Sequence, residues 1–336
     1  MDEKVNILMA TYNGEKYLNE QIDSLLNQTY KNIQIIISDD CSKDSTKNIL
    51  KQYEEQEPQK IKVFYQEKNL GYVKNFEFLL NYEKEQEDSS IYMLCDQDDV
   101  WKEEKVERSL EKLKEGNYDL VFGDIEVIDE NLNTKLKSYN DFMHLTPRIK
   151  KYISSYKLQY LYNCMTGCTI ISRKELLNKV LPFPKNSKYV IHDYWLGLIA
   201  EIYGKVGYLQ TPYILYRQHG TNQVGIFKAS YNYNTIYPVR DVNIKVKLGV
   251  FETYLQNERI FPKEIQDLNR EAYNYFKMLQ TKNKINFKGW KTFHKLYKTE
   301  TLFLYLENFM TLNLPVILEP FYKIRYYRIK NKKLNY

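Results

Sequence analysis

The first part of the chain alternates short apolar runs with segments in which apolar residues recur every three or four positions. Runs of this length are typical of buried strands, and the three- or four-residue spacing is typical of one buried helix face. The predicted strands are residues 5–10, 33–38, 61–65, 91–95 and 119–123. Strands that alternate with helices of about 10–15 residues predict an α/β fold, in which helices cover both faces of a parallel sheet.

The same patterns predict elements further along the chain. A helix is expected from about Trp101 to Leu113, and a strand-like stretch ends at Ile171. A helix then opens at His192-Asp193, and residues 205–209 and 213–216 are predicted as two further strands. From about residue 226 onward the pattern is helical, rich in tyrosine and lysine.

Polar side chains stand where three of the predicted strands end: Thr11, then Asp39 and Asp40, then Asp96, Asp98 and Asp99. Carboxyl ends of parallel strands meet at one edge of the sheet, where ligands bind, so these side chains are expected to lie together. Clustered carboxylates repel one another, and Mg²⁺ or Mn²⁺ can compensate them. The alternatives are a solvated acidic loop at residues 96–99 and simple turn chemistry at Asp39 and Asp40.

Composition and charge narrow the class of protein. The 336 residues hold no apolar run of about 18 residues, as a spanning helix would need, and no signal-peptide pattern. The four cysteines have no zinc-finger spacing, so a reduced, cytoplasmic protein is the simplest interpretation. Residues 1–225 carry 29 basic and 34 acidic side chains (net −5), whereas residues 226–336 carry 20 and 9 (net +11). The basic part is expected to meet an anionic partner.

Two common nucleotide-binding motifs are absent from the sequence. No Gly-x-Gly-x-x-Gly follows the first predicted strand, and there is no Walker-type glycine-lysine loop. Their absence argues against a dinucleotide-dependent oxidoreductase and a phosphate-loop NTPase. It also argues against a sugar-phosphate nucleotidyltransferase, because residues 11–14 do not form a glycine-rich phosphate loop.

Three motifs, in order, resemble those of the family 2 inverting glycosyltransferases of the GT-A fold: residues 9–14, residues 38–46 and residues 96–99. The resemblance covers roughly residues 4–225 and implies sugar transfer from a nucleotide diphosphate donor, UDP- or dTDP-linked, with Mn²⁺ or Mg²⁺. By resemblance, Asp98 and Asp99 bind the metal. The residues expected to bind the donor are Thr11, Tyr12, Asn13, Asp40, Lys74, Asp96 and Asp98. Cys41 departs from the glycine or asparagine that is common in the family.

The rest of the predicted site comes from the region after residue 160. In the resembling family an acid at the start of the helix near residue 193 is the catalytic base, and Asp193 matches it; the alternative is a first-turn carboxylate favoured by the helix dipole. Arg217 is expected to bind the diphosphate through its forked guanidinium. His219 is expected to complete the metal shell, with a structural histidine as the alternative. The stretch from His192 to His219 resembles bacterial rhamnosyltransferases most.

The predicted domains are a GT-A catalytic domain at 1–225 and a basic helical extension at 226–336. The last fifteen residues carry six basic side chains and no acidic one. Such an end can lie on an anionic bilayer, here the inner face of the plasma membrane, or can pack on the catalytic domain. No nucleic acid partner is expected. The predicted acceptor is a bacterial surface glycan or lipid-linked oligosaccharide. The rival prediction is a non-catalytic nucleotide- or glycan-binding protein.

Overall fold

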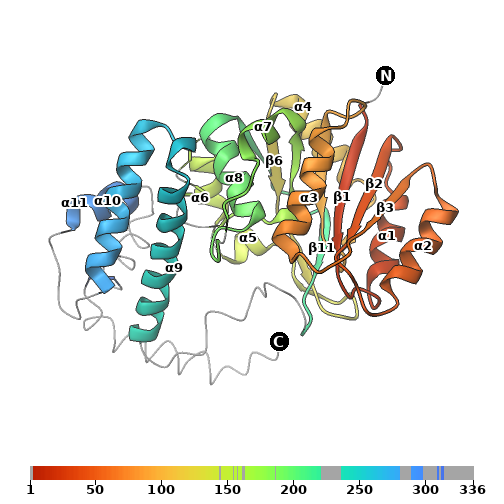
Figure 1. Cartoon of the computed structure of the whole chain (residues 1–336), viewed down its shortest axis with the longest axis horizontal. Helices are drawn as coiled ribbons and strands as arrows, with labels where there is room; N and C mark the ends of the chain where they lie inside the picture. Colours follow the sequence, from red (N-terminus) through yellow and green to blue (C-terminus); the bar gives the residue numbers. More distant parts are fainter. Residues whose placement is uncertain are drawn as a thin grey trace. The chain divides into compact units, whose positions relative to one another are not determined.

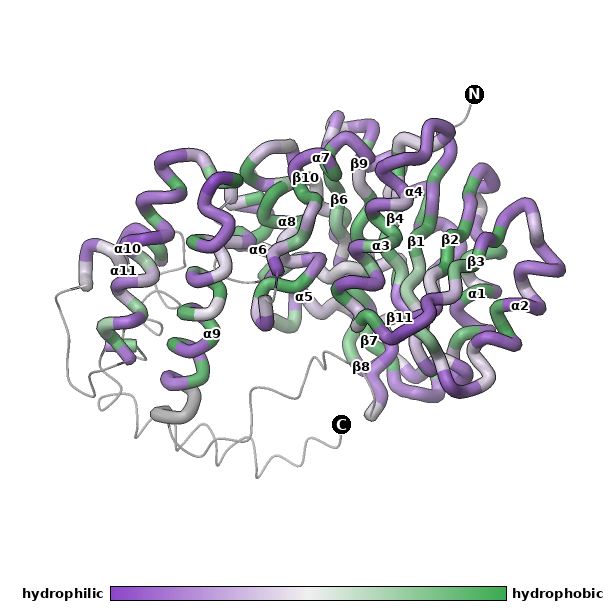
Figure 2. Tube along the Cα trace, viewed as in Figure 1, coloured by the Kyte–Doolittle hydropathy of each residue, from purple (hydrophilic) through white to green (hydrophobic). Residues whose placement is uncertain are grey.

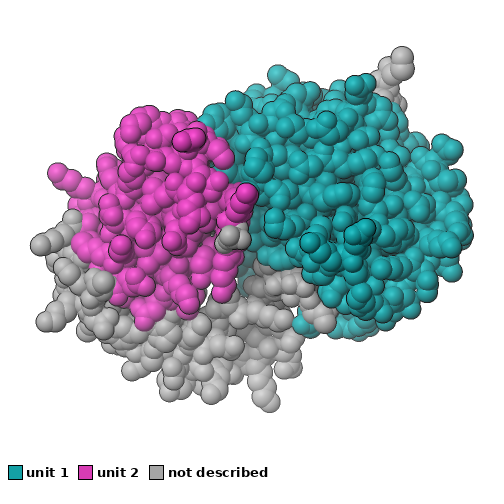
Figure 3. All heavy atoms as spheres, in the orientation of Figure 1, with its two compact units in different colours: residues 1–183, 191–220 teal, residues 184–190, 221–336 magenta. Residues whose placement is uncertain are grey.

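The structure is a computed structural model (Figure 1). It describes residues 3–143, 145–153, 155–156, 158–160, 163–185, 187–220, 236–280 and 289–297, with 309 and 312–313. The chain divides into two compact units, 1–183 with 191–220 and 184–190 with 221–336 (Figure 3). The predicted boundary at residues 225 and 226 and the basic end of the chain lie outside the described residues, so the roles predicted for them stay predictions.

The larger sheet of the first unit has seven strands in the order β10-β6-β9-β4-β1-β2-β3. Its strands are β1 (Val5–Thr11), β2 (Ile33–Asp39), β3 (Ile61–Tyr65), β4 (Ile91–Cys95), β6 (Leu120–Gly123), β9 (Ile171–Arg173) and β10 (Val206–Leu209). All neighbouring pairs are parallel except those of β9, which runs antiparallel to β4 and to β6. The predicted α/β fold is confirmed, and the antiparallel β9 is the departure from the predicted parallel sheet.

The core lies at the middle of this sheet. The side chains of Ile7, Leu8 and Met9 on β1 are fully buried, as is all of β4. In Figure 2 the central strands are mostly green, while the outer surfaces of the helices are mostly purple. Helices cover both faces of a parallel sheet, so its strands read as continuous apolar runs.

The helices form two layers (Figure 1). On one face lie α1 (Leu18–Leu26), α2 (Thr46–Gln56) and α4 (Lys105–Glu115). Gln28, just after α1, donates to the carbonyl of Lys102 at 3.0 Å and accepts from the amide of Val106 at 3.0 Å, so α1 and the start of α4 are joined. On the other face α3 (Tyr72–Lys84) packs with α7 (Leu177–Val180) and α8 (His192–Tyr203).

A second, four-stranded sheet has the order β5-β11-β7-β8. Its strands are β5 (Val100–Trp101), β7 (Glu126–Ile128), β8 (Thr134–Leu136) and β11 (Ile214–Arg217). The helix predicted from about Trp101 begins instead at Lys105, because Val100 and Trp101 pair with β11. The stretch predicted as strand up to Ile171 is a 3₁₀ turn, η1 (Gly167–Thr169), followed by β9. Three shorter elements complete this unit: α5 (Tyr139–Phe142), α6 (Thr146–Tyr152) and η2 (Lys174–Leu176).

The second unit is helical where residues 236–297 are described, and its part at 184–190 is irregular. It contains α9 (Ile236–Gln256), η3 (Glu258–Ile260), α10 (Lys263–Gln280) and α11 (Trp290–Tyr297). Phe251 of α9 stacks on Phe276 of α10, with ring centroids 5.7 Å apart, and both side chains are fully buried. Among the described residues, no helix combines the length and hydropathy needed to cross a membrane.

Candidate active site

The carboxyl ends of β1 and β2 are joined by hydrogen bonds. The amide of Asp40 donates to the carbonyl of Thr11 at 2.8 Å, and Thr11 Oγ1 donates to Asp39 Oδ1 at 3.3 Å. All three residues are buried. The structure therefore brings the first two predicted polar groups together at one edge of the sheet, called here the carboxyl edge.

The carboxylate of Asp40 binds the turn that precedes α3. Its Oδ1 accepts from the amide of Leu70 at 2.6 Å and its Oδ2 accepts from the amide of Gly71 at 2.8 Å. Gly71 has φ of +81°, a backbone conformation that favours glycine. Asp40 thus fixes the position of the turn, and any contact with a nucleoside base would use the remaining lone pairs of its oxygens.

Tyr12 and Asn13 form the loop after β1. The side-chain amide of Gln97 binds Tyr12 through both of its polar atoms, and the amide of Asn13 donates to Ser42 Oγ at 2.9 Å. A Cβ atom added to Gly14 would stand 2.4 Å from Gln97 Oε1, so glycine is what allows Gln97 this close approach. These contacts hold the loop after β1 against Gln97, which follows β4, and against Ser42, which follows β2.

Lys74, on the first turn of α3, is mostly exposed, and its Nζ lies 3.8 Å from Glu77 Oε2. No described contact joins it to the residues at the carboxyl edge. Its predicted role in donor binding stays a prediction.

Asp98 and His219 lie together, although 121 positions separate them in the sequence. Asp98 Oδ2 is 2.8 Å from His219 Nε2, and the imidazole ring packs against Tyr17 with ring centroids 4.9 Å apart. Both side chains are slightly exposed, at 18% and 8%. A carboxylate oxygen beside an imidazole nitrogen is a donor set that Mn²⁺ accepts, with water or phosphate oxygens in the other positions.

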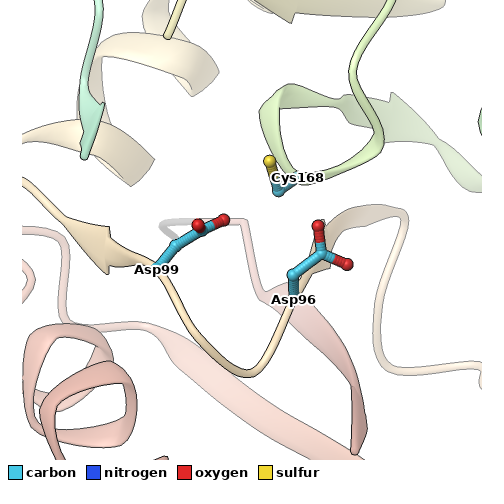
Figure 4. A group of neighbouring side chains, drawn as sticks. All are labelled: Asp96, Asp99 and Cys168. Atoms are coloured by element: carbon cyan, nitrogen blue, oxygen red, sulfur yellow. The ribbon is translucent and has the colours of Figure 1, made fainter. Parts of the chain in front are cut away.

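Asp99 belongs to a different group of side chains. Its carboxylate points towards Asp96 and towards Cys168 of η1 (Figure 4). The three predicted metal ligands therefore fall into two groups: Asp98 lies with His219, and Asp99 lies with Asp96 and Cys168. Burial, followed by repulsion from Asp98, raises the pKa of Asp96 to about 7 and raises the pKa of Asp99 well above its usual range.

A buried lysine lies next to these acids. Lys105 Nζ stands 3.4 Å from the centre of the Trp101 ring, and the residue is 2% exposed. Burial lowers the pKa of Lys105 to about 8, against the attraction of Cys168, Cys95 and Asp99. Lysine is seldom buried without a charged partner, so the acids provide a reason for its position. The lysine was not predicted as part of the site, because sequence spacing alone does not reveal burial.

Arg217 is buried among protein acceptors. Its side chain is 0% exposed and was predicted to bind the diphosphate. Its Nε donates to the carbonyl of Asp98 at 2.9 Å, one terminal nitrogen donates to the carbonyl of Glu130 at 3.1 Å, and the other pairs with Glu20. Its guanidinium also lies over the Tyr17 ring at 4.5 Å. Because these donors are directed at protein acceptors, Arg217 positions the acidic loop in this structure, and its predicted role in diphosphate binding stays a prediction.

Asp193 occupies the first turn of α8, as predicted, and is 7% exposed. Its Oδ1 accepts from Asn163 Nδ2 at 3.0 Å and from the amide of Tyr194 at 2.6 Å, and its Oδ2 accepts from the amide of Gly167 at 3.2 Å. These bonds fix the orientation of the carboxylate. Asn163 was not singled out from the sequence, which carries no motif around it.

His192, beside Asp193, faces the apolar layer. Its ring stacks on Phe76 with centroids 4.2 Å apart, and burial lowers its pKa, so it is neutral near pH 7. Gly167 passes close by, and a Cβ atom there would stand 3.1 Å from His192 Nε2 and 3.4 Å from Asp193 Cβ. Small size at residue 167 therefore permits the contact between its amide and Asp193.

Comparison with known proteins identifies the family. The family described as "Glycosyl transferase family 2" matches residues 6–181, more than half of the chain. The chain is 31% identical over 234 residues to the dTDP-rhamnosyl transferase RfbG of Shigella flexneri, which covers 66% of this chain and 76% of that protein.

Solved structures support the same fold. A structure of TarS residues 1–349 from S. aureus with UDP-GlcNAc has a TM-score of 0.55 at 18% identity and covers 97% of this chain and 89% of that one. The mannosyltransferase PcManGT from Pyrobaculum calidifontis, with GDP-Man and Mn2+, has a TM-score of 0.53 at 14% identity and covers 97% and 84%. Both are GT-A glycosyltransferases in fold. The chain therefore belongs to glycosyl transferase family 2 and is a nucleotide-sugar-dependent glycosyltransferase.

Proposed function

We propose that this enzyme is a metal-dependent, inverting glycosyltransferase whose donor binds at the carboxyl edge, between the acidic loop (residues 96–99) and Asp193. One observation carries the proposal. Gly167 and Cys168 are consecutive in the sequence, and the first donates to Asp193 while the second lies beside Asp96 and Asp99. Asp193 also helps to raise the pKa of Asp96 electrostatically. In a sugar transfer the base must reach the acceptor hydroxyl while the acids bind the metal and the donor. A base and a group of acids this close together can therefore act on the same sugar.

The metal would be held by Asp98 and His219, whose side chains already touch. Oxygen and imidazole ligands suit Mn²⁺ or Mg²⁺, and the partial exposure of both side chains leaves positions for phosphate oxygens or water. When bound, such an ion acts as a Lewis acid on the diphosphate leaving group. The Mn2+ in the PcManGT structure supports the presence of a metal in an enzyme of this fold.

Asp193 would act as the general base. Its carboxylate takes the proton of an acceptor hydroxyl while that oxygen forms a bond to the anomeric carbon of the donor. The bond from the anomeric carbon to the phosphate oxygen breaks on the opposite face, so the configuration inverts and the nucleoside diphosphate leaves. Asn163 and the amide of Gly167 hold the carboxylate in one orientation, which saves the entropy of positioning it.

The donor we favour is a dTDP-linked sugar, with rhamnose as the first candidate, since the Shigella relative is named a dTDP-rhamnosyl transferase. Calorimetric titration of the full chain with UDP and with dTDP, each with and without Mn²⁺, tests the donor site. We expect metal-dependent binding, with dTDP preferred. If neither nucleotide binds to the folded protein with Mn²⁺ present, the proposed donor site is wrong.

For the acceptor we propose a hydroxyl of a bacterial surface glycan, carried on a lipid-linked oligosaccharide. The net charge of +11 on residues 226–336 supports a partner that presents anionic groups, such as a lipid diphosphate or an anionic membrane surface. Co-sedimentation of the full chain with vesicles of anionic or of zwitterionic lipid tests whether the basic extension binds an anionic membrane surface. Equal sedimentation with both would contradict a membrane role for the basic extension.

A further inference from the structure

Three side chains at the carboxyl edge form a possible ligand set that the proposed reaction does not use as a unit. They are Asp96 and Asp99 of the acidic loop and Cys168 of η1, called here the carboxylate–thiol group (Figure 4). A carboxylate oxygen of each aspartate and the Sγ of Cys168 all lie within 4.8 Å of one another. They are the one group of three such ligands found among the described residues.

One atom of this group lacks the partner that its burial demands. Asp99 is 0% exposed, and its Oδ1 accepts from the amide of Arg217 at 3.0 Å. Its Oδ2 is buried and accepts from no N–H or O–H group among the described residues, and the only donor beside it is the weak one of the Cys168 thiol. Figure 4 shows this carboxylate directed towards Asp96 and Cys168. A buried carboxylate oxygen without a strong donor is costly, and a bound cation would satisfy it.

The charges around the group leave room for a dication. Without a cation, burial favours the protonated forms of Asp99 and Cys168, because it raises the pKa of each well above its usual range. With a cation bound, two carboxylates and a thiolate would carry three negative charges, and Lys105, buried beside Cys168 and Asp99, supplies one positive charge. Lys105 Nζ has no hydrogen-bond partner among the described residues, so it acts on the group as a charge at a distance. One divalent cation brings the sum to zero, which is what a buried site requires.

The ligand types select the cation. Mg²⁺ prefers six oxygen ligands and keeps several waters, which a site with Cys168 1% exposed does not offer. Zn²⁺ accepts thiolate and carboxylate together, with three protein ligands and one open position. Its bond lengths place neighbouring ligand atoms roughly 3.4–3.7 Å apart, so small side-chain rotations would close the group around the ion.

We propose that Asp96, Asp99 and Cys168 bind Zn²⁺, at a site separate from the Asp98–His219 pair, and that zinc inhibits the enzyme there. Binding would release to solvent the protons held by the Cys168 thiol and the Asp99 carboxyl, and would form one metal–sulfur bond and two metal–oxygen bonds, with no oxidation or reduction. Zinc would withdraw Asp96 from the donor. The inhibition therefore rests on the proposed function, whereas zinc binding itself does not.

Cobalt substitution tests the site without turnover. Co²⁺ bound to a thiolate gives a near-ultraviolet sulfur-to-cobalt absorption band, which we expect in the full-length protein and which Zn²⁺ should abolish by competition. Cys168→Ser should lose the band, while Cys41→Ser, which removes a cysteine outside the group, should keep it. His219→Ala should keep the band and lose Mn²⁺ binding, as measured by calorimetry, whereas Cys168→Ser should keep Mn²⁺ binding.

Two results would overturn the inference. One is a cobalt–sulfur band that survives in Cys168→Ser, and the other is the absence of any band in a folded protein at saturating Co²⁺. Zinc titrations of sugar transfer then test the inhibition, which Cys168→Ser should weaken relative to its own zinc-free rate. If the band behaves as expected but the protein transfers no sugar, the proposed function is wrong and the zinc site stands.

Discussion

The side-chain amide of Gln97 pairs with both backbone polar groups of Tyr12. The amide of Tyr12 donates to Gln97 Oε1 at 2.8 Å, and Gln97 Nε2 donates to the carbonyl of Tyr12 at 3.0 Å. The loop after β1, predicted to bind the nucleoside, is thus joined to the loop predicted to bind the metal. Gln97 forms with the backbone of Tyr12 the two hydrogen bonds that a neighbouring strand would form. It thereby fixes the loop after β1 relative to the acidic loop.

Gly14→Ala tests this relationship. The new Cβ would stand 2.4 Å from Gln97 Oε1, the far end of a flexible side chain, so Gln97 should swing away at little cost in folding free energy. We expect weaker binding of nucleoside diphosphate in Gly14→Ala and in Gln97→Ala, and no further loss in the double variant, because both remove the same pairing. Calorimetric titration of the three variants measures their affinity for nucleoside diphosphate. If the two single variants acted independently of the pairing, their losses in binding free energy would add in the double variant.

Asp193→Asn should retain donor binding and lose turnover. Asparagine keeps the size of the side chain but cannot accept the acceptor's proton, and general-base catalysis contributes about 100- to 10,000-fold to rate. Asn163→Ala keeps the base and removes one of its hydrogen bonds, so a smaller loss is expected. Rates of sugar transfer, measured beside donor affinity, separate the two. Near-normal turnover in a folded Asp193→Asn would rule out the assigned base.

His219→Ala should make donor binding insensitive to Mn²⁺. Removing the imidazole beside Asp98 Oδ2 takes away one of two proposed ligands, and we expect Mn²⁺ affinity to fall at least about tenfold, or 1.4 kcal/mol. His294→Ala, in the second unit, is the matched control and should bind like the wild type. Equal manganese affinity in both variants would contradict the assignment of His219.

Asp40→Ala should lower stability as well as donor binding. The substitution removes two charge-assisted hydrogen bonds, to the amides of Leu70 and Gly71, each worth about 1.5 kcal/mol or more. Asp40→Asn should not restore both, because its Nδ2 can only donate towards an amide that also donates. Urea unfolding of both variants, with exposed Asp88→Asn as control, measures the loss. Unchanged unfolding midpoints would show that the turn is held by other contacts.

The free energy of unfolding should depend on pH through Asp96. Its pKa is about 7 in the folded protein, raised from 3.8 by burial and by repulsion from Asp98 and Asp193. Between about pH 4 and pH 7 the folded state binds the proton of Asp96 more tightly than the unfolded state does. The contribution of protonated Asp96 to the free energy of unfolding is therefore complete below about pH 4 and is lost as the pH rises through 7. Asp96→Asn should flatten this part of the profile in metal-free urea titrations. An identical slope in the variant would contradict the shift.

The sheet and its acidic edge could be predicted because the signals were local. The buried runs of β1, β2 and β4 are continuous in the sequence, and the polar residues that follow each run stand at the edge by the geometry of parallel strands. β7 and β8 could not be predicted in the same way. They are three residues each and partly polar, and they exist because β11, about ninety residues later, pairs with β7.

Two site residues depended on contacts that a sequence does not encode. Arginine is usually exposed, so the burial of Arg217 against Glu20 and two carbonyls could not be predicted from its position in the sequence. Cys168 stands beside Asp96 because β9 runs antiparallel to β4, with Ile171 opposite Met93. Local periodicity predicts that a strand exists, but it does not predict which strands it will pair with or in which direction.

The reversed direction of β9 has a consequence for how such an enzyme could be re-engineered. The chain leaves the sheet at the carboxyl end of β6, near Gly123, and re-enters at the start of β9, which lies on the same edge. The segment between them is therefore an insert with both ends anchored at one rim, and it carries Asn163 and Gly167, the residues that orient Asp193. Transplanting this segment together with its strands β7 and β8 would exchange the surroundings of the base while leaving the register of the seven-stranded sheet intact.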